Sequence, residues 1–167
     1  LARDPQARSI NFWSLGTFTG ADWMQVKIAT VLLVIAIVAS YYFIKPLNAI
    51  LLGEEEAAML GIPLRKFRRN LLIINTLLVA IITSFVGVIG FIGLIVPHIA
   101  RILVGSNHKY LIPTSLLIGS ILLSMADIAA RLLLAPAEIP IGIITSLIGA
   151  PIFIILLRRH LVITKHD

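Results

Sequence analysis

The chain has no cysteine and little charge. Its 167 residues include 0 Cys, and only 13% are Asp, Glu, Lys or Arg. The lack of cysteine excludes disulfides, thiolate metal sites and cysteine nucleophiles. An ordinary soluble domain is about 25% charged, whereas this chain is 59% hydrophobic. A soluble fold of this size could not bury that much apolar surface, so the composition indicates a membrane protein whose outer helix faces are solvated by lipid.

Catalytic motifs are missing as well. The sequence has no phosphate-binding Gly-Lys loop, no nucleophile elbow and no paired carboxylates in a cleft-like context. It therefore predicts no catalytic residue, no metal site and no cofactor, and any ATPase has to be a separate chain. The net charge of +6 does not indicate nucleic acid, because the basic residues lie in short loops that flank apolar spans.

Apolar runs separated by polar turns predict about five membrane spans. A membrane-spanning helix needs roughly 20 mostly apolar residues. The predicted helices cover residues 23–44, about 70–87, about 93–105, 110–134 and 139–157. The predicted fold class is therefore all-α, a polytopic transmembrane helical bundle.

The longest uncharged run, residues 71–100, does not fit a single span. Thirty residues are too many for one helix across a core of about 30 Å and too few for two. Gly87 and Gly90 predict a tight turn in its middle, and Pro97 suits the first turn of the short helix that follows. Non-helical backbone at membrane depth is tolerated only where protein or water surrounds it, so we expect the short helix inside the bundle.

The basic residues predict the orientation. If segment 46–70 is cytoplasmic, alternation of the spans places ten of the 14 Lys and Arg on the cytoplasmic side, in agreement with the positive-inside rule. The ten are Lys45, Arg65, Lys66, Arg68, Arg69, Arg101, Lys109, Arg158, Arg159 and Lys165.

Three regions follow from this topology. We predict an extracytoplasmic segment at 1–22, a transmembrane bundle at 23–158 that includes the cytoplasmic loop 46–70, and a cytoplasmic tail at 159–167. Because the chain starts with Leu1 and no signal peptide precedes the first span, we expect it to be the C-terminal part of a longer protein.

The loop 46–70 combines acidic, apolar and basic stretches. Three glutamates, Glu54–Glu56, are followed by the helix-forming residues 57–60 and then by the basic residues 65–69. This composition predicts two short interfacial helices joined near Gly61. Composition alone leaves open whether the loop is merely solvated or is a docking surface for a soluble partner.

Ionisable residues inside spans are costly and usually face protein or water. Asp127 and Arg131 lie four residues apart, on one helix face. They form either a self-neutralising pair or a pair whose arginine also binds an external carboxylate. His98 and Arg101 share a face of the short helix; one interpretation is that Arg101 reaches the interface while His98 bonds to buried backbone groups.

Several long segments, in order and at the right spacing, closely resemble the permease subunits of iron–siderophore, haem and cobalamin ABC importers, the FecCD-like family. These segments are 52–61 (LGEEEAAMLG), 87–101 (GVIGFIGLIVPHIAR), 126–131 (ADIAAR), 138–142 (EIPIG) and 148–153 (IGAPIF). The resemblance covers about residues 10–158. It implies a ten-helix permease, of which this chain holds the last five helices.

The resemblance also implies partners and residue roles. The family's partners are two cytoplasmic ATPase subunits, a periplasmic or lipoprotein substrate-binding protein and a second permease copy. The ATPase-coupling segment corresponds to Gly53, Glu54, Ala57, Leu60 and Gly61. Binding-protein docking corresponds to Arg131 and, less directly, to Glu138. The signature residues Gly93, Pro97, His98, Arg101 and Asp127 have no assigned role.

The sequence thus predicts part of a multi-pass permease in a bacterial inner membrane. The expected substrate is a metal chelate, ferric siderophore before haem, cobalamin or an oxyanion, moved by alternating access. The alternative is an ion-coupled secondary transporter or channel, which needs an intramembrane carboxylate or histidine at a midplane cavity. Only His98 and Asp127 qualify for that role.

Overall fold

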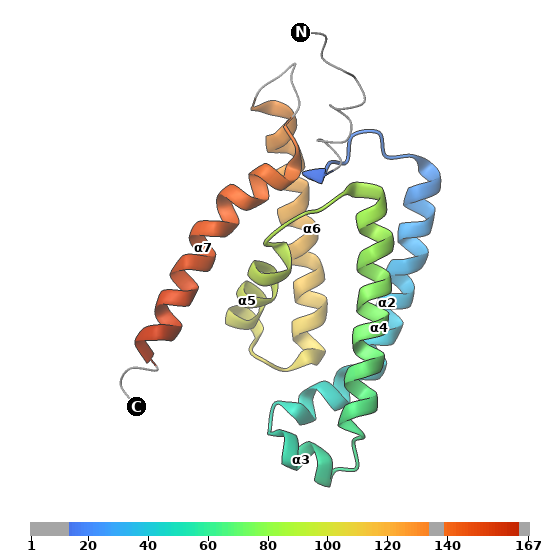
Figure 1. The fold of residues 1–167 in the computed structure, drawn as a ribbon, viewed down its shortest axis with the longest axis vertical. Helices are drawn as coiled ribbons and strands as arrows, with labels where there is room; N and C mark the ends of the chain where they lie inside the picture. The colour runs from blue at the N-terminus through green and yellow to red at the C-terminus, as the bar shows by residue number, and fades with distance from the viewer. Residues whose placement is uncertain (1–13, 134–138, 164–167) are drawn as a thin grey trace.

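The computed structural model describes residues 14–133 and 139–163, and the fold is a bundle of helices. Within these residues there is no strand. The helices are α2 (Trp23–Ile50), α3 (Glu54–Met59), α4 (Leu64–Val86), α5 (Ile92–Val104), α6 (His108–Leu132) and α7 (Ile141–Ile163) (Figure 1). The all-α prediction is confirmed.

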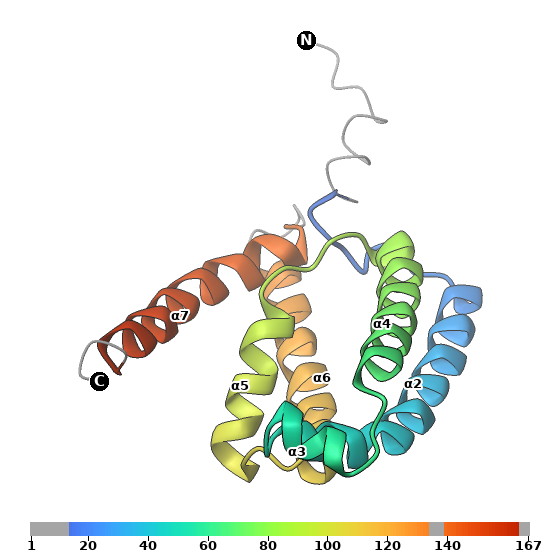
Figure 2. The same cartoon turned by 60° about the horizontal axis from the view of Figure 1, so that its bottom comes forward.

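Two antiparallel pairs make up most of the bundle. α2 runs beside α4, α5 folds back along α6, and α7 starts at the end of α6 and leans away from the other helices (Figures 1 and 2). α3 lies at the end of the bundle opposite the start of α7. Three helices, α2, α4 and α6, are long and apolar enough to cross a membrane, and α5 and residues 141–155 of α7 are shorter apolar helices. The fold therefore agrees with the prediction of about five spans.

Local signals explain where the long helices begin. Asp22 accepts a hydrogen bond from the backbone N–H of Met24 at 2.7 Å, and Gln25 bonds back to the backbone of Asp22, which completes a capping box. Asn107 caps α6 by accepting from the N–H of Lys109 at 3.0 Å. These caps satisfy N–H groups that a helix start otherwise leaves without partners.

The prediction for segment 46–70 was wrong in part. Lys45 and Pro46 do not end the first helix, because α2 contains Pro46 and continues to Ile50. The loop also holds one short helix, α3, instead of two, since the basic residues after Gly61 form the first turns of α4. Proline removes one backbone donor and bends a helix without ending it where the next turns are held by other contacts.

The glycine-rich turn was predicted correctly, but the position of Pro97 was not. Residues 87–91 are non-helical, and α5 begins at Ile92, so Pro97 is the sixth residue of α5 and lies outside its first turn. One face of α5 is buried through Ile95, Val96 and Ala100, while His98 on another face is exposed. In this chain, therefore, α5 is only partly enclosed.

Three segments cross closely at the end of the bundle that carries the start of α7. They are the segment before α2, the turn after α4 and the start of α7 itself. The N–H groups of Ile141 and Gly142 donate to the carbonyls of Gly16 and Leu15 at 2.9 and 3.0 Å. A Cβ on Gly142 would lie 2.0 Å from the carbonyl oxygen of Leu15. Only glycine permits so close a backbone approach, which fixes the start of α7 against the chain before α2.

A second crossing lies about two turns further along α7. Phe91, just before α5, has a left-handed backbone with φ 64°. A Cβ on Gly149 would come within 2.3 Å of the Cβ of Phe91. α7 therefore rests directly on the non-helical turn between α4 and α5, and Gly149 makes room for it. A small apolar core of Ala126, Ala130, Ile141 and Ile144 joins α6 to the start of α7.

Candidate functional site

The segment that joins α2 to α4, residues 51–63, folds around α3 and is called the α3 loop below. Gly53 precedes α3 with φ 138°, a conformation that side chains rarely adopt. The first turn of α3 carries Glu54, Glu55 and Glu56. Carboxylates at this position stabilise the helix because its N-terminus bears a partial positive charge.

The end of α3 is fixed by a Schellman motif. The N–H of Gly61 donates to the carbonyl of Ala58 at 2.9 Å, and the N–H of Ile62 donates to the carbonyl of Ala57 at 3.2 Å. This pair of bonds needs a left-handed residue after the C-cap, and Gly61 supplies it with φ 77°. The loop therefore has a defined shape in spite of its short helix.

The α3 loop exposes an apolar tip. Ala57 is fully buried and faces the bundle, whereas Met59 and Leu60 are 82% and 67% exposed. Acidic residues precede this tip, and the basic first turns of α4 follow it. Apolar side chains inside a charged rim are a common arrangement at protein–protein interfaces.

One contact holds the α3 loop against α4, and a second joins α4 to α2 beside it. Arg68 of α4 forms an ion pair with Glu54 of α3. The buried ring of Phe67 packs edge-to-face on Phe43 of α2, with 5.5 Å between ring centroids. The five residues predicted for coupling, namely Gly53, Glu54, Ala57, Leu60 and Gly61, all lie in this loop.

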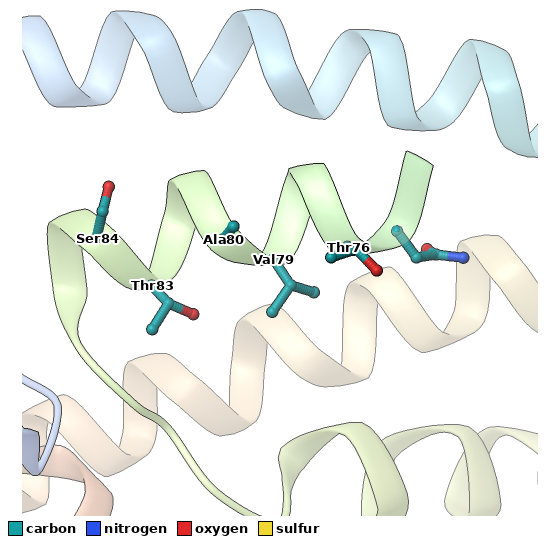
Figure 3. A pocket seen from close by; sticks show the side chains of 6 residues that line it. Thr76, Val79, Ala80, Thr83 and Ser84 are labelled. Atoms are coloured by element: carbon teal, nitrogen blue, oxygen red, sulfur yellow. The ribbon is translucent and has the colours of Figure 1, made fainter. Parts of the chain in front are cut away.

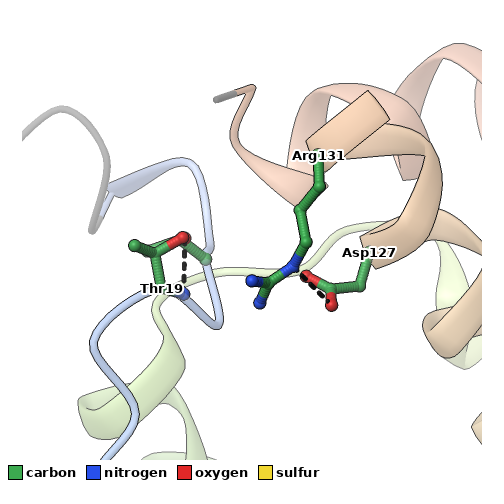
Figure 4. A network of polar contacts seen from close by, with 4 residues as sticks. Thr19, Asp127 and Arg131 are labelled. Carbon is green, nitrogen blue, oxygen red and sulfur yellow. Dashed lines mark hydrogen bonds and ion pairs between the residues drawn. The ribbon is translucent and has the colours of Figure 1, made fainter. Parts of the chain in front are cut away.

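At the opposite end of the bundle, Arg131 and Asp127 form the predicted pair. The Nε of Arg131 donates to Oδ2 of Asp127 at 2.9 Å, and the side chains are 49% and 25% exposed. Arg131 lies in the last turn of α6, where a cation is stabilised by the helix dipole. Figure 4 shows the guanidinium pointing toward Asp127, with the loop that carries Thr19 nearby. Half of the arginine side chain is still accessible from outside.

Glu138, the second residue predicted for binding-protein docking, lies outside the described residues. The described residues that follow Glu138 form backbone hydrogen bonds with other segments. The N–H of Ile139 donates to the carbonyl of Ala130 at 3.3 Å, and Ile141 donates to Gly16.

The signature residues of α5 are Gly93, Pro97, His98 and Arg101, of which Pro97 is half-buried. Gly93, His98 and Arg101 are all exposed, and a Cβ on Gly93 would meet no atom within 4 Å. The interpretation that His98 bonds to buried backbone groups stays a prediction. Since Pro97 has no N–H, the carbonyl of Gly93 has no helical donor four residues on.

α4 carries an open pocket of about 600 Å³ along one side. Its lining consists of Asn75, Thr76, Val79, Ala80, Thr83 and Ser84, all from this helix (Figure 3). Small and polar side chains on a membrane helix allow another helix to approach closely. The pocket holds no group of titratable side chains.

A polar cluster near the α3 loop was not predicted. Oδ1 of Asn48 in α2 lies 2.9 Å from both the backbone nitrogen and Nδ1 of His108, and Nδ2 of Asn48 donates to Oδ1 of Asn107 at 3.0 Å. Asn107 could have been recognised as an N-cap residue from its place before an apolar helix. The partnership with Asn48 could not, because about 60 residues separate them in the sequence.

Comparison with known proteins gives consistent matches over nearly the whole chain. The model of the FecCD transport family matches residues 1–159. The hemin transport system permease protein HmuU of Yersinia pestis is 39% identical over 160 residues, which are 96% of this chain and 48% of the relative. The probable siderophore transport system permease protein YfhA of Bacillus subtilis is 44% identical over 154 residues, 92% of this chain and 45% of the relative.

Further relatives extend the range of substrates. The vitamin B12 import system permease protein BtuC of Salmonella newport is 45% identical over 155 residues, 91% of this chain and 46% of the relative. A solved structure described as an inward-facing conformation of a metal-chelate type ABC transporter has a TM-score of 0.80 and 35% identity, and the match covers 94% of this chain and 51% of that chain. The chain thus spans about half the length of the relatives that it matches.

Proposed function

The chain belongs to the FecCD transport family, and from this membership we propose that it is part of the membrane permease of a binding-protein-dependent ABC importer for a metal chelate. Ferric siderophore is the substrate class that we place first, with haem, cobalamin and an oxyanion such as molybdate as competitors. The haemin, siderophore and vitamin B12 permeases among its relatives support the class.

The α3 loop is the proposed binding surface for a separate cytoplasmic ATPase, which displaces the loop during transport. The observation that carries this role is the shape of the loop, in which a capped helix presents exposed Met59 and Leu60 while Ala57 anchors the opposite face. A surface that transmits displacement has to keep its shape under load. The Schellman motif at Gly61 and the Glu54–Arg68 ion pair serve that purpose.

Arg131 is the proposed contact for a substrate-binding protein on the other side of the membrane. The Arg131 side chain is half exposed, and the planar guanidinium fork matches the geometry of a carboxylate on a partner protein. Glu138 is proposed to face the same partner, because it follows Arg131 closely in the sequence.

The proposed topology follows from the positive-inside rule. Segment 46–70 and the tail 159–167 are cytoplasmic, segment 1–22 is extracytoplasmic, and the bundle 23–158 crosses a bacterial inner membrane. The rest of the permease and a second permease copy complete the translocation path. The permease performs no chemistry itself. ATP binding moves the α3 loop, and the helices tilt so that access alternates between the two sides.

The test is uptake by the full-length permease that contains this chain, reconstituted with its ATPase and binding protein in proteoliposomes. Radiolabelled ferric siderophore, haem, cobalamin and molybdate are compared, with and without internal ATP. ATP-dependent uptake of one chelate supports the proposal. Uptake that needs a proton or sodium gradient and proceeds without the ATPase would refute it in favour of a secondary transporter.

A further inference from the structure

Pro46 gives α2 a point of weakness close to the α3 loop. Proline cannot donate to the carbonyl four residues before it, so one helical hydrogen bond is absent there. Beyond this point the last turn of α2 heads toward the ends of α5 and α6 (Figures 1 and 2). A displacement of the α3 loop could be lost in bending of α2 at Pro46 unless the last turn is held from the side.

Asn48 holds that last turn from the side. Its Oδ1 accepts the backbone N–H of His108 at 2.9 Å, which is one of the first N–H groups of α6. Its Nδ2 donates to Oδ1 of Asn107 at 3.0 Å, the same oxygen that caps Lys109. Asn48 therefore supplies α6 with a second cap that comes from another helix.

The backbone bond also fixes the chemistry of the other contacts. A backbone N–H can only donate, so the atom of Asn48 that faces it has to be the oxygen. Nδ1 of His108 lies 2.9 Å from the same oxygen and therefore carries a proton. Protonation of the other ring nitrogen leaves this Nδ1–H donor in place.

Backbone hydrogen bonds connect the start of the α3 loop to Asn48 and the two residues after it. The N–H groups of Leu51, Leu52 and Gly53 donate to the carbonyls of Asn48, Ala49 and Ile50 at 3.2, 3.1 and 3.2 Å. Ala49 beside Asn48 and Leu111 in the first turns of α6 are both buried. A push on α3 thus reaches the N-terminus of α6 through hydrogen-bonded turns and one side chain.

α6 then runs across the bundle. It also contains a proline, Pro113, which leaves one helical hydrogen bond absent, but packing along α5 supports the helix there. It has 25 residues and is roughly 37 Å long at 1.5 Å per residue. Its far end bears Asp127 and Arg131. We propose that Asn48 is a positioning residue that clamps the α3 loop to α6, so that the ATPase-facing loop and the Arg131 end move together. This inference rests on the proposed function, since it assigns a route between its two docking surfaces.

The experiment measures transported substrate per ATP hydrolysed in proteoliposomes that hold the full-length permease, the ATPase and the binding protein. Asn48→Leu keeps the size of the side chain and removes every polar contact of the clamp. Mutations on a coupling route change the coupling by factors of about two to thirty, and we expect a loss of about five- to tenfold. Stimulation of the ATPase by the loaded binding protein should fall by the same factor, while its unstimulated rate stays within about twofold.

Two further variants separate coupling from folding. Asn48→Asp retains the acceptor for both His108 contacts. We expect its transport per ATP to be at least half of that of the unmodified complex. Thr30→Val keeps the size of the side chain and removes a hydrogen bond that stays within one helix, from Oγ1 to the carbonyl of Val26. It should leave the ratio unchanged. All variants are compared as monodisperse, ATPase-bound complexes, so that a variant that does not assemble is recognised.

The outcomes are distinguishable. If the unmodified complex transports a chelate with ATP and Asn48→Leu keeps the same ratio, the clamp is refuted and the proposed function stands. An equal loss in Asn48→Leu and Thr30→Val also refutes the clamp, because it indicates general damage. If Asn48→Leu does not assemble, Asn48→Asp becomes the test of the clamp. Transport per ATP below a tenth of the value of the unmodified complex in Asn48→Asp then refutes the clamp. If the unmodified complex does not transport with ATP, the proposed function fails first.

Discussion

Replacing Gly61 by alanine should uncouple the ATPase from transport without affecting assembly of the helices. Gly61 has φ 77°, and a Cβ at this position would meet no atom within 4 Å. The whole cost is therefore conformational. A residue with a Cβ pays about 1–2 kcal/mol for a left-handed backbone. That free energy opposes the Schellman motif at the end of α3, since both of its hydrogen bonds need this backbone.

The cost translates into a loss of coupling. A change of about 1–2 kcal/mol shifts an equilibrium about 5- to 30-fold. If opening of the motif removes Met59 and Leu60 from their docking positions, the transport per ATP should fall within that range. Gly61→Pro should abolish coupled transport, because proline cannot adopt the backbone angle and also loses the N–H that bonds to Ala58.

Gly20 provides a matched control. It has φ 83° and likewise would meet no atom within 4 Å, but it lies before α2, at the end of that helix remote from the α3 loop. Gly20→Ala carries the same backbone strain and should leave transport per ATP within about twofold. The assay is paired measurement of uptake and phosphate release in proteoliposomes. Equal coupling in Gly61→Ala and the unmodified complex, or equal losses in both alanine variants, would falsify the reasoning.

Two further predictions concern the Arg131 end and the crossing of α7. Arg131→Glu should weaken docking of the binding protein by about tenfold or more, roughly 1.4 kcal/mol per factor of ten, and a glutamate-to-lysine change in the partner should restore part of it. Lys27→Glu, an exposed charge reversal at the start of α2, is the control in the same binding measurement. Unchanged docking in Arg131→Glu would refute the role of Arg131 as a contact for the binding protein. Gly149→Ala should lower the thermal unfolding temperature, because its Cβ would lie 2.3 Å from Phe91 and overpacking costs about 1–3 kcal/mol. Gly93→Ala, with open space around the new Cβ, should be neutral or stabilising, and similar melting curves for the two variants would contradict the crossing.

The sequence predicted the α3 loop well in content and less well in form. Its acidic start, apolar centre and glycine end are local features, and the structure places them together in one capped turn. The prediction of a second short helix was wrong, because the basic residues 65–69 belong to the start of α4. A helix that begins at the basic residues after Pro63 continues into the apolar run, and nothing in the loop composition marks where solvent ends and lipid begins.

The pair Asp127–Arg131 was predictable because its spacing of four residues places both side chains on one helix face. The exposure of His98 was not predictable in the same way. Which face of α5 is buried depends on where α6 and α7 lie, and those helices cover Ile95, Val96 and Ala100 and leave His98 exposed.

The number of spans, the likeness to FecCD permeases and the positions of the caps were determined by the sequence itself. These depend on hydropathy over a window of about 20 residues and on hydrogen bonds between near neighbours in the chain. The contact of Asn48 with His108 and the close approach of Gly149 to Phe91 were decided only by the tertiary structure. Such contacts arise where two helices cross, and the crossing depends on the fit of surfaces from distant segments, which no local pattern contains.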